Sequence, residues 1–289
     1  MEAVTPDPNP VIAVGTHRSG TTFLGQVLEQ HPDVAFWEEP RHVWVRGNAS
    51  RPDDVLTAAD ARPAVVRSIR RRFAEHQRRL GKPRFAEKTP SNCLRLPFVD
   101  AVFPNAIYVH IYRDGRAVVN STARLLERAT PNRAAMVQRL LGTPPWEWPA
   151  YANRFAHTVW AKLRGGRMSF WGPRPPGWQG WLEAGDPPSV VLAKQWRCTI
   201  EPVLEFRERV DAERWLDFRY EDLASDPRGH VARILEHCGL EQRPEVLDFV
   251  QERTDRSRAE GWRSELGGDG LEEMRPILEP VLERLGYDW

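Results

Sequence analysis

The chain has 289 residues, which is enough for one α/β domain whose core needs no metal or disulfide to be stable. Its net charge is +1, so a general nucleic-acid surface is not indicated and any anion site must be built locally. The widely spaced Cys93, Cys198 and Cys238 predict neither a metal site nor a disulfide framework. With no signal peptide or apolar run of membrane-spanning length, and with an arginine bias typical of GC-rich bacteria, we expect a bacterial, cytoplasmic protein without a membrane span.

The first predicted element is a buried strand that leads directly into a phosphate-binding loop. The strand covers 11–14, and Gly15-x4-Gly20 follows with the spacing of such a loop. A helix over 22–30 comes next, so its free N–H groups and dipole favour an anion. Thr21 and Thr22 stand where an ATPase has Lys and Ser or Thr. The frame of a nucleotide site is therefore present without the lysine that reaches the β- and γ-phosphates.

The next segments continue an alternation of strands and helices. A strand over 34–37 ends at Glu38-Glu39-Pro40, and an amphipathic helix over 63–80 starts on a proline, which suits a first turn. The arginines of that helix favour a solvated face over a polyanion patch. Further strands are predicted over 84–86 and 107–112, and further helices over 94–103 and 115–127.

Residues 129–190 interrupt this alternation, because they are rich in Pro, Gly and Trp with only a short helix expected over 154–163. Such a segment is often a lid or a binding region. Its tryptophans could form the core of the lid, or line an acceptor site where flat rings stack on sugars or aromatic rings. Regular structure resumes with helices over 190–209, 227–238 and 271–285 and a strand over 215–218.

The alternation predicts an α/β fold with a central parallel sheet and helices on both faces, a three-layer sandwich. We interpret residues 1–289 as a single domain. Within it, residues 11–128 form a donor-binding half, 129–190 the lid or acceptor region, and 191–289 a C-terminal half.

A second anion-binding signal follows the strand over 107–112. Arg113 stands at the carboxyl end of that strand, where ligands bind in open α/β sheets, and Ser121 lies two turns into the next helix. The two side chains can converge on a second phosphate. Taken alone, the Arg-Asp-Gly turn could equally be a helix start capped by Asp114.

Together these motifs resemble the sulfotransferase family that uses 3′-phosphoadenosine 5′-phosphosulfate (PAPS). Residues 17–22 resemble the 5′-phosphosulfate loop, with His17 where the family usually has Pro, and Arg113 to Ser121 keeps the spacing of the 3′-phosphate motif. The sequences of residues 87–90 and 218–223 resemble two further strand-end motifs of the family. The match spans about 11–125 and 215–240 and is nearest to the bacterial and tyrosylprotein-type branch, which implies a P-loop-like fold.

The resemblance also implies roles. Arg18 would stabilise the leaving 5′-phosphate, Lys88 would contact the sulfuryl group, and Glu39 would be the base. Because adjacent carboxylates point in different directions, we expect only one of Glu38 and Glu39 to face the cleft. His17 competes with Glu39 for the role of base. The residues expected to bind the donor are Arg18, Ser19, Gly20, Thr21, Thr22, Arg113, Ser121 and Tyr220.

Two weaker matches belong to the same resemblance. Arg124 lies one position from an arginine used in the tyrosylprotein-type branch. Trp262 and Arg263 resemble a late segment that covers the nucleotide.

The function expected is therefore sulfuryl transfer from PAPS to a hydroxyl of a small-molecule or carbohydrate acceptor, in secondary metabolism. A P-loop kinase for a nucleoside or small molecule is the alternative, and the missing lysine counts against it. A binding-only protein is a third hypothesis, against which the set of Arg18, Lys88, Arg113 and Ser121 argues. The partner expected is a small-molecule or glycan acceptor, not a nucleic acid, and a homodimer is left open.

Overall fold

The computed structural model describes residues 7–128, 170–253, 261–265 and 267–289. Its centre is a five-stranded sheet in the order β2-β3-β1-β4-β5, and every neighbouring pair is parallel. The strands are β1 (Val11–Val14), β2 (Val34–Glu38), β3 (Arg84–Lys88), β4 (Ile107–Tyr112) and β5 (Trp215–Arg219). The expected α/β sandwich with a parallel central sheet is confirmed.

The central strand β1 shows why this sheet is buried on both faces. All four of its residues are at most 1% exposed. Successive side chains of a strand point to opposite faces, so Ile12 and Val14 join one core and Val11 and Ala13 join another. An uninterrupted apolar strand is what a parallel sheet covered on both sides requires.

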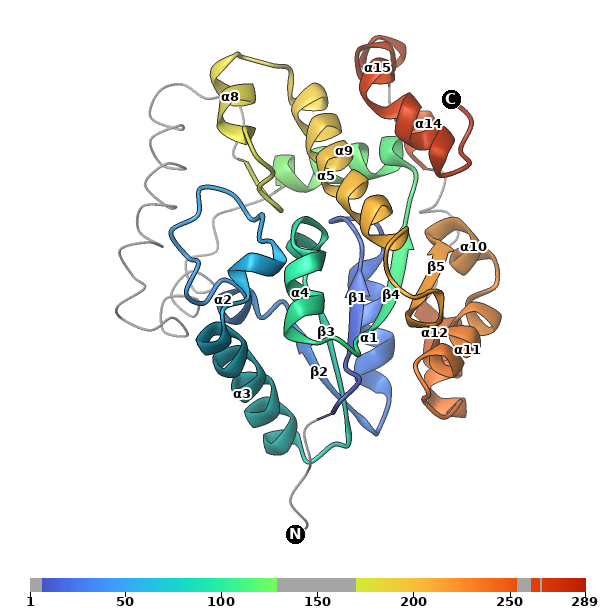
Figure 1. Cartoon of the computed structure of the whole chain (residues 1–289). Coiled ribbons are helices and arrows are strands. Elements are labelled where there is room, and N and C mark those ends of the chain that lie inside the picture. The colour runs from blue at the N-terminus through green and yellow to red at the C-terminus, as the bar shows by residue number, and fades with distance from the viewer. Residues whose placement is uncertain (1–6, 129–169, 254–260, 266) are drawn as a thin grey trace.

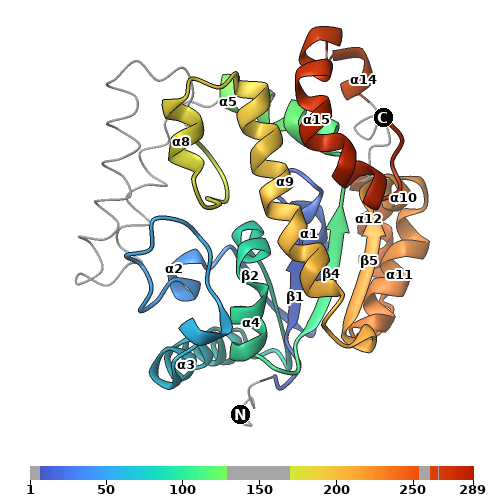
Figure 2. The same ribbon diagram turned by 45° about the horizontal axis from the view of Figure 1, so that its top comes forward.

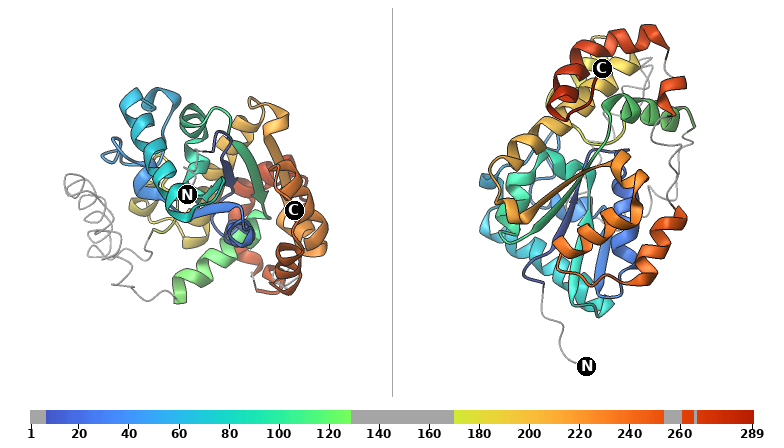
Figure 3. Two further views of the ribbon diagram at one scale, coloured as in Figure 1. Left: turned by 90° about the horizontal axis from the view of Figure 1, so that it is seen from below. Right: turned by 90° about the vertical axis from the view of Figure 1, so that its right-hand side faces the viewer.

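Helices cover the two faces of the sheet, as Figures 1 and 2 show. On one face lie α3 (Pro63–Leu80), α4 (Leu96–Val102) and the second half of α9 (Pro188–Arg207). On the other lie α1 (Thr21–Gln30), α11 (Pro227–His237) and α12 (Pro244–Arg253). Figure 3 shows the sheet between these layers.

A third cluster of apolar side chains lies beyond the carboxyl ends of the strands. It joins α5 (Gly115–Arg128) and α9 to α15 (Gly268–Arg284). The short α14 (Trp262–Glu265) runs beside α5, and α8 (Trp178–Glu183) packs on α9 (Figure 1). The short helices α2 (Arg41–Trp44) and α10 (Tyr220–Ser225) each follow the end of a strand.

Several predicted elements differ from the structure. The helix expected over 94–103 is a 3-10 helix, Pro90–Leu94, and then α4, with a break at Arg95. The strand expected over 84–86 extends to Lys88, and the strand-end motif at 220–223 is helix α10. The helices α2, α8, α10, α12 and α14 were not predicted. The helix expected over 154–163 lies outside the described residues.

No helix among the described residues is long and apolar enough to cross a membrane.

Candidate donor-binding and transfer site

The loop between β1 and α1 has a backbone that only its two glycines allow. A Cβ at Gly15 would lie 2.5 Å from the carbonyl oxygen of Ile111, and Gly20 has a φ of +103°. Gly20 is also the N-cap of α1 and supplies no side-chain hydrogen bond. The first N–H groups of α1 therefore have no capping side chain, and a helix N-terminus in this state favours an anion.

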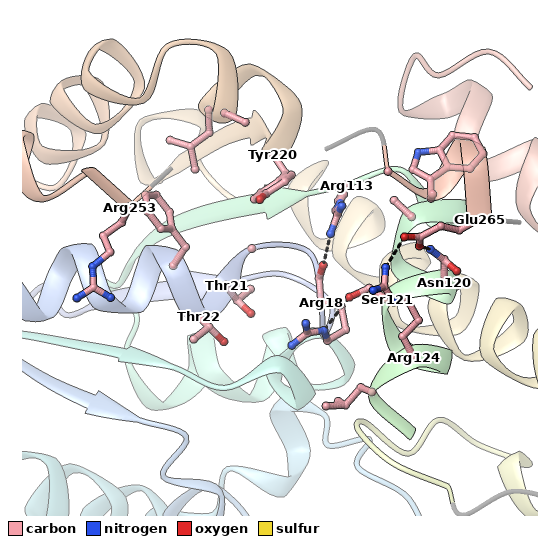
Figure 4. A pocket seen from close by; sticks show the side chains of 18 of the residues that line it. Arg18, Thr21, Thr22, Arg113, Asn120, Ser121, Arg124, Tyr220, Arg253 and Glu265 are labelled. Atoms are coloured by element: carbon pink, nitrogen blue, oxygen red, sulfur yellow. Dashed lines mark hydrogen bonds and ion pairs between the residues drawn. The ribbon is translucent and has the colours of Figure 1, made fainter. Parts of the chain in front are cut away.

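Arg18 connects the loop to the second anion-binding motif. Its own φ is +63°, a left-handed conformation that costs free energy for a residue with a Cβ and is often found at functional sites. Its Nε donates a hydrogen bond of 3.0 Å to Ser121 Oγ, and Arg113 Nη1 donates one of 3.3 Å to the Arg18 carbonyl (Figure 4). The two segments predicted to hold separate phosphates thus meet at Arg18.

Tyr220 packs tightly against both motifs. The Arg113 guanidinium lies 4.6 Å from the centre of its ring, and a Cβ at Gly20 would be 2.6 Å from Tyr220 Cδ2. Tyr220 begins α10 at the end of β5, the strand next to β4. Neighbouring parallel strands end at the same edge, which explains how residues so distant in sequence come together.

A pocket of about 1010 Å³ opens between these groups (Figure 4). Seven of the eight residues expected to bind the donor line it. They are Arg18, Gly20, Thr21, Thr22, Arg113, Ser121 and Tyr220. Ser19 does not, because its buried hydroxyl donates instead to the carbonyl of Thr16, at 2.7 Å, and so holds the loop itself.

Residues outside the expected donor-binding set also line the pocket. Arg128 ends α5 and Arg253 ends α12, and both add positive charge to the lining. Trp262 and Glu265 come from α14. Arg253 could not be foreseen, since its helix was not predicted. The late-segment match had pointed to Trp262.

The expected transfer residues form a separate group beside the pocket lining, at the ends of β2 and β3. Lys88 is 1% exposed, and its Nζ lies 2.9 Å from Glu39 Oε1 and 3.1 Å from Glu38 Oε1. Lys88 pairs in register with Ala13 of β1, which places this group next to the phosphate-binding loop. A buried ammonium is stable only when its charge is compensated, and here two carboxylates compensate it.

The expectation that Glu38 and Glu39 point in different directions is wrong, since both reach Lys88. The reason lies in the backbone. Glu39 has a φ of +48°, so the alternation of side chains that holds along β2 ends there. The N–H of Glu39 donates to the Lys88 carbonyl at 2.8 Å, which fixes this turn beside β3.

Arg41 completes the group, and sequence reasoning gave it no role. Its Nη2 lies 2.7 Å from Glu39 Oε2. Burial alone would raise the pKa of Glu39, but the charges of Arg41 and Lys88 outweigh burial and hold that pKa below its usual value. Glu39 is therefore an ionised carboxylate at neutral pH, able to accept a proton. Its side chain is 29% exposed.

His17 is in a different state from Glu39. It is 3% exposed, and the ring of Trp171 meets it edge-on with centroids 5.6 Å apart. Burial, together with the charges of Arg18 and Arg41, lowers the pKa of His17 to about 3. Gln195 donates to the carbonyls of Trp171 and Pro173, at 2.8 Å each, and so holds this cover over the imidazole.

Glu87, the only acidic residue of β3, anchors the strand. It is fully buried and accepts hydrogen bonds from Trp44, Thr89 and Asn92. Burial raises its pKa to about 7, although the hydrogen bonds from Thr89 and Trp44 and the charges of Arg95 and Lys88 act in the opposite direction.

Asp114 caps the start of helix α5, and the nearby Arg116 contacts α14, which forms part of the pocket wall. The Asp114 carboxylate accepts the N–H of Arg116 at 2.8 Å, so the Asp-capped helix start and the anion motif coexist. Asp114 also binds the guanidinium of Arg116, which lies 4.6 Å from the centre of the Trp262 ring and 5.1 Å from that of Trp289. Arg116 thus holds Trp262 in the pocket wall.

The family model described as the sulfotransferase family matches residues 10–168 and 165–244, which is most of the chain. The chain belongs to the sulfotransferase family. Members of this family take the sulfuryl group from PAPS. The matched residues include the phosphate-binding loop, Lys88 and the Arg113–Ser121 motif.

Curated relatives cover part of the chain. A putative protein-tyrosine sulfotransferase of Caenorhabditis briggsae is 32% identical over 130 residues, which is 40% of this chain and 42% of that protein. Protein-tyrosine sulfotransferase 1 of Homo sapiens is 32% identical over 125 residues, 39% of this chain and 33% of that protein. Carbohydrate sulfotransferase 7 of Mus musculus is 37% identical over 69 residues, which is 24% of this chain and 14% of that protein. The chain spans less than half the length of these relatives.

Solved structures share the fold over nearly the whole chain. The sulfotransferase domain from the curacin biosynthetic pathway aligns with a TM-score of 0.61 at 14% identity, covering 98% of this chain and 99% of that one. The sulfotransferase domain from the Synechococcus PCC 7002 olefin synthase aligns with a TM-score of 0.55 at 19% identity, covering 99% and 97%. These likenesses support the fold assignment.

The residues of the pocket fit the charge of PAPS. The donor carries anionic groups at the 3′ and 5′ ends of one ribose. The pocket has two anion-binding groups, an uncapped helix N-terminus with Arg18 and the pair of Arg113 and Ser121, which would suit two such charged ends. Among the described lining residues, Glu265 is the only acid and five are arginines.

Proposed function

We propose that this protein is a PAPS-dependent O-sulfotransferase that acts on a hydroxyl of a small-molecule or carbohydrate acceptor. The observation that carries the proposal is the contact between Arg18 and Ser121, which joins the two anion-binding motifs across one pocket. A bisphosphorylated adenosine has its two charged ends on one ribose and so calls for two such motifs close together. A nucleoside triphosphate has its charges in one chain and does not.

In this proposal the chain stabilises the leaving phosphate, binds the transferring group and, through Glu39, removes the acceptor proton. PAPS provides a sulfuryl group, whose bond to the 5′-phosphate breaks as a bond to the acceptor oxygen forms, leaving 3′,5′-ADP and a sulfate ester. Arg18 and the N-terminus of α1 offset the charge left on the 5′-phosphate. Lys88 offers a compact cation to the transferring group.

Glu39 takes the acceptor proton in this proposal. Its carboxylate is ionised and partly exposed, whereas His17 is covered by Trp171 and has a pKa of about 3. Glu38 also touches Lys88, but Arg41 orients only Glu39. Lys88 binds one oxygen of the Glu39 carboxylate and Arg41 binds the other, and these two contacts fix its direction.

An acceptor with a flat face or ring suits the surface nearby. Trp171 is 39% exposed and lies against His17, which directly precedes Arg18 in the loop. Indole rings present a flat apolar surface on which sugar and aromatic rings stack. We therefore place the acceptor between Trp171 and Glu39 in this proposal.

The cell compartment is part of the proposal. The thiols of Cys93, Cys198 and Cys238 are all unpaired, and the first and last are buried. Free thiols are stable in a reducing compartment, so we propose a bacterial cytoplasm as the site of action. Fractionation of the source cells followed by immunoblotting tests this.

The direct test is transfer of radiolabelled sulfate from PAPS to a panel of phenols, sugars, lipids and a tyrosine peptide, with EDTA present. We expect a labelled small-molecule or glycan product. Arg18→Ala should lower turnover at least tenfold, or about 1.4 kcal/mol of barrier. Arg67→Ala, an exposed arginine of α3, is the matched control and should retain full activity. Labelling of the peptide alone would overturn the acceptor class, and phosphate transfer from ATP–Mg²⁺ would overturn the reaction.

A further inference from the structure

The donor pocket contains a carboxylate of the protein itself. Glu265, on α14, accepts a hydrogen bond from Asn120 Nδ2 at 2.6 Å and forms an ion pair with Arg124 (Figure 4). Asn120 and Arg124 lie one turn apart on α5, next to Ser121. The carboxylate therefore lies at the end of the pocket assigned above to the 3′-phosphate.

The charge of this carboxylate is fixed at neutral pH. Its hydrogen bonds with Asn120 and Arg124, together with the charges of Arg124 and Arg128, hold the pKa of Glu265 below its usual value. A ligand phosphate that approaches Ser121 thus meets a resident negative charge, and Arg124 already has a partner.

We propose that Glu265 is an internal anion that competes with the 3′-phosphate of donor and product for Arg124, and so limits how tightly the pocket holds 3′,5′-ADP. This inference rests on the proposed function. When a 3′-phosphorylated nucleotide binds, Arg124 exchanges the carboxylate for the phosphate. A nucleotide without a 3′-phosphate leaves the Glu265–Arg124 pair intact.

Glu265 also has an effect that would strengthen nucleotide binding. The net effect on affinity depends on whether this contribution is larger or smaller than the repulsion. The pair also ties α14 to α5, which supports the Trp262 wall. Arg124 and Glu265 are 44% and 37% exposed, however, and exposed ion pairs contribute little to stability. The nucleotide brings two phosphate groups into a pocket shared with the carboxylate, so repulsion outweighs the loss of the tie.

The test is calorimetric titration of the full chain and its Glu265→Gln variant with 3′,5′-ADP and with 5′-AMP. Glutamine keeps the size of the side chain and can still accept from Asn120. We expect the variant to bind 3′,5′-ADP about threefold to tenfold more tightly and 5′-AMP within twofold of the original chain. The gain should shrink as NaCl rises from low salt to about 0.5 M, because salt screens exposed charges.

The matched control is Glu201→Gln, which breaks an exposed Arg197–Glu201 pair of 2.9 Å on α9, outside the pocket lining. It should change neither affinity. Unchanged or weaker binding of 3′,5′-ADP by Glu265→Gln would overturn the inference while leaving the donor assignment intact. Failure of the unmodified chain to bind 3′,5′-ADP would instead overturn the proposed function.

Discussion

At the scale of single residues, the site depends on two side chains held in left-handed backbone conformations. Arg18 has a φ of +63° and Glu39 a φ of +48°, and neither is a glycine. Each conformation costs free energy and persists only where surrounding contacts enforce it. For Arg18 these contacts come from Arg113 and Ser121, and for Glu39 they come from Lys88 and Arg41.

The two neighbouring carboxylates allow a sharp test of the base. Glu39→Gln should lower kcat about a hundredfold or more, because general base catalysis contributes at least that much. Glu38→Gln removes a carboxylate that also touches Lys88, and should lower kcat less than tenfold. Steady-state kinetics with a fixed acceptor measures both. Equal losses in the two variants would show that charge balance around Lys88, and not proton transfer to Glu39, controls the rate.

Sequence reasoning reached the residues of this site but not their arrangement. Arg18, Arg113 and Ser121 could be named because their motifs have fixed spacing beside a strand and a helix. The shared contact of Glu38 and Glu39 with Lys88 could not, because it depends on a positive φ at a glutamate, which sequence does not reveal. The role of Arg41 depends on the same turn.

At the scale of secondary structure, the loop between β1 and α1 sets the geometry of the pocket. Element boundaries marked by proline or glycine were predicted well, as for β1 and α3. The bounds of β4 were also predicted, from its continuous run of Ile, Tyr and Val around His110. α10 was missed because its motif reads as the continuation of β5. The contribution of α14 to the pocket depends on its packing against α5, a contact between segments far apart in sequence.

Gly20 tests the loop at this scale. Alanine there would adopt a φ of +103°, and its Cβ would lie 2.6 Å from Tyr220 Cδ2 and 2.8 Å from Ile111 Cδ1. Gly20→Ala should displace Tyr220 and weaken 3′,5′-ADP binding at least tenfold. Gly81 ends α3 with a φ of +66°, and a Cβ added there would have no atom within 4 Å, so Gly81→Ala is the matched control.

That control should lose about 1 kcal/mol of stability, from the left-handed backbone alone, and no affinity. Titration calorimetry and thermal unfolding measure the two effects separately. Comparable affinity losses in both variants would mean that general destabilisation, and not the shape of the loop, weakens binding.

At the scale of the whole molecule, the buried carboxyl of Glu87 links stability to pH. Its pKa is raised to about 7 in the folded chain, against about 4.5 when exposed. A raised carboxyl pKa stabilises the fold below the unfolded pKa, and that stabilisation is lost as pH rises from about 4.5 through 7. Above pH 7 the folded chain must hold a buried charge.

Glu87→Gln should remove this pH dependence. The introduced amide can keep the bonds from Trp44 and Thr89, and the side chain of Asn92, whose oxygen has no partner, can turn to accept from it. The difference in Tm between the variant and the original chain should be about 2 to 5 °C more favourable to the variant at pH 8 than at pH 5. Scanning calorimetry at the two pH values measures this, and a parallel shift at both would show that Glu87 does not titrate in this range.

The same fold, with charge gathered at one edge of the sheet, carries the central claim: one pocket binds both ends of a bisphosphorylated adenosine. A crystal structure with 3′,5′-ADP tests it most directly. We predict the 3′-phosphate within hydrogen-bond distance of Arg113 and Ser121, and the 5′-phosphate on the N–H groups at the start of α1. A 3′-phosphate lying away from Arg113 and Ser121 would contradict the account.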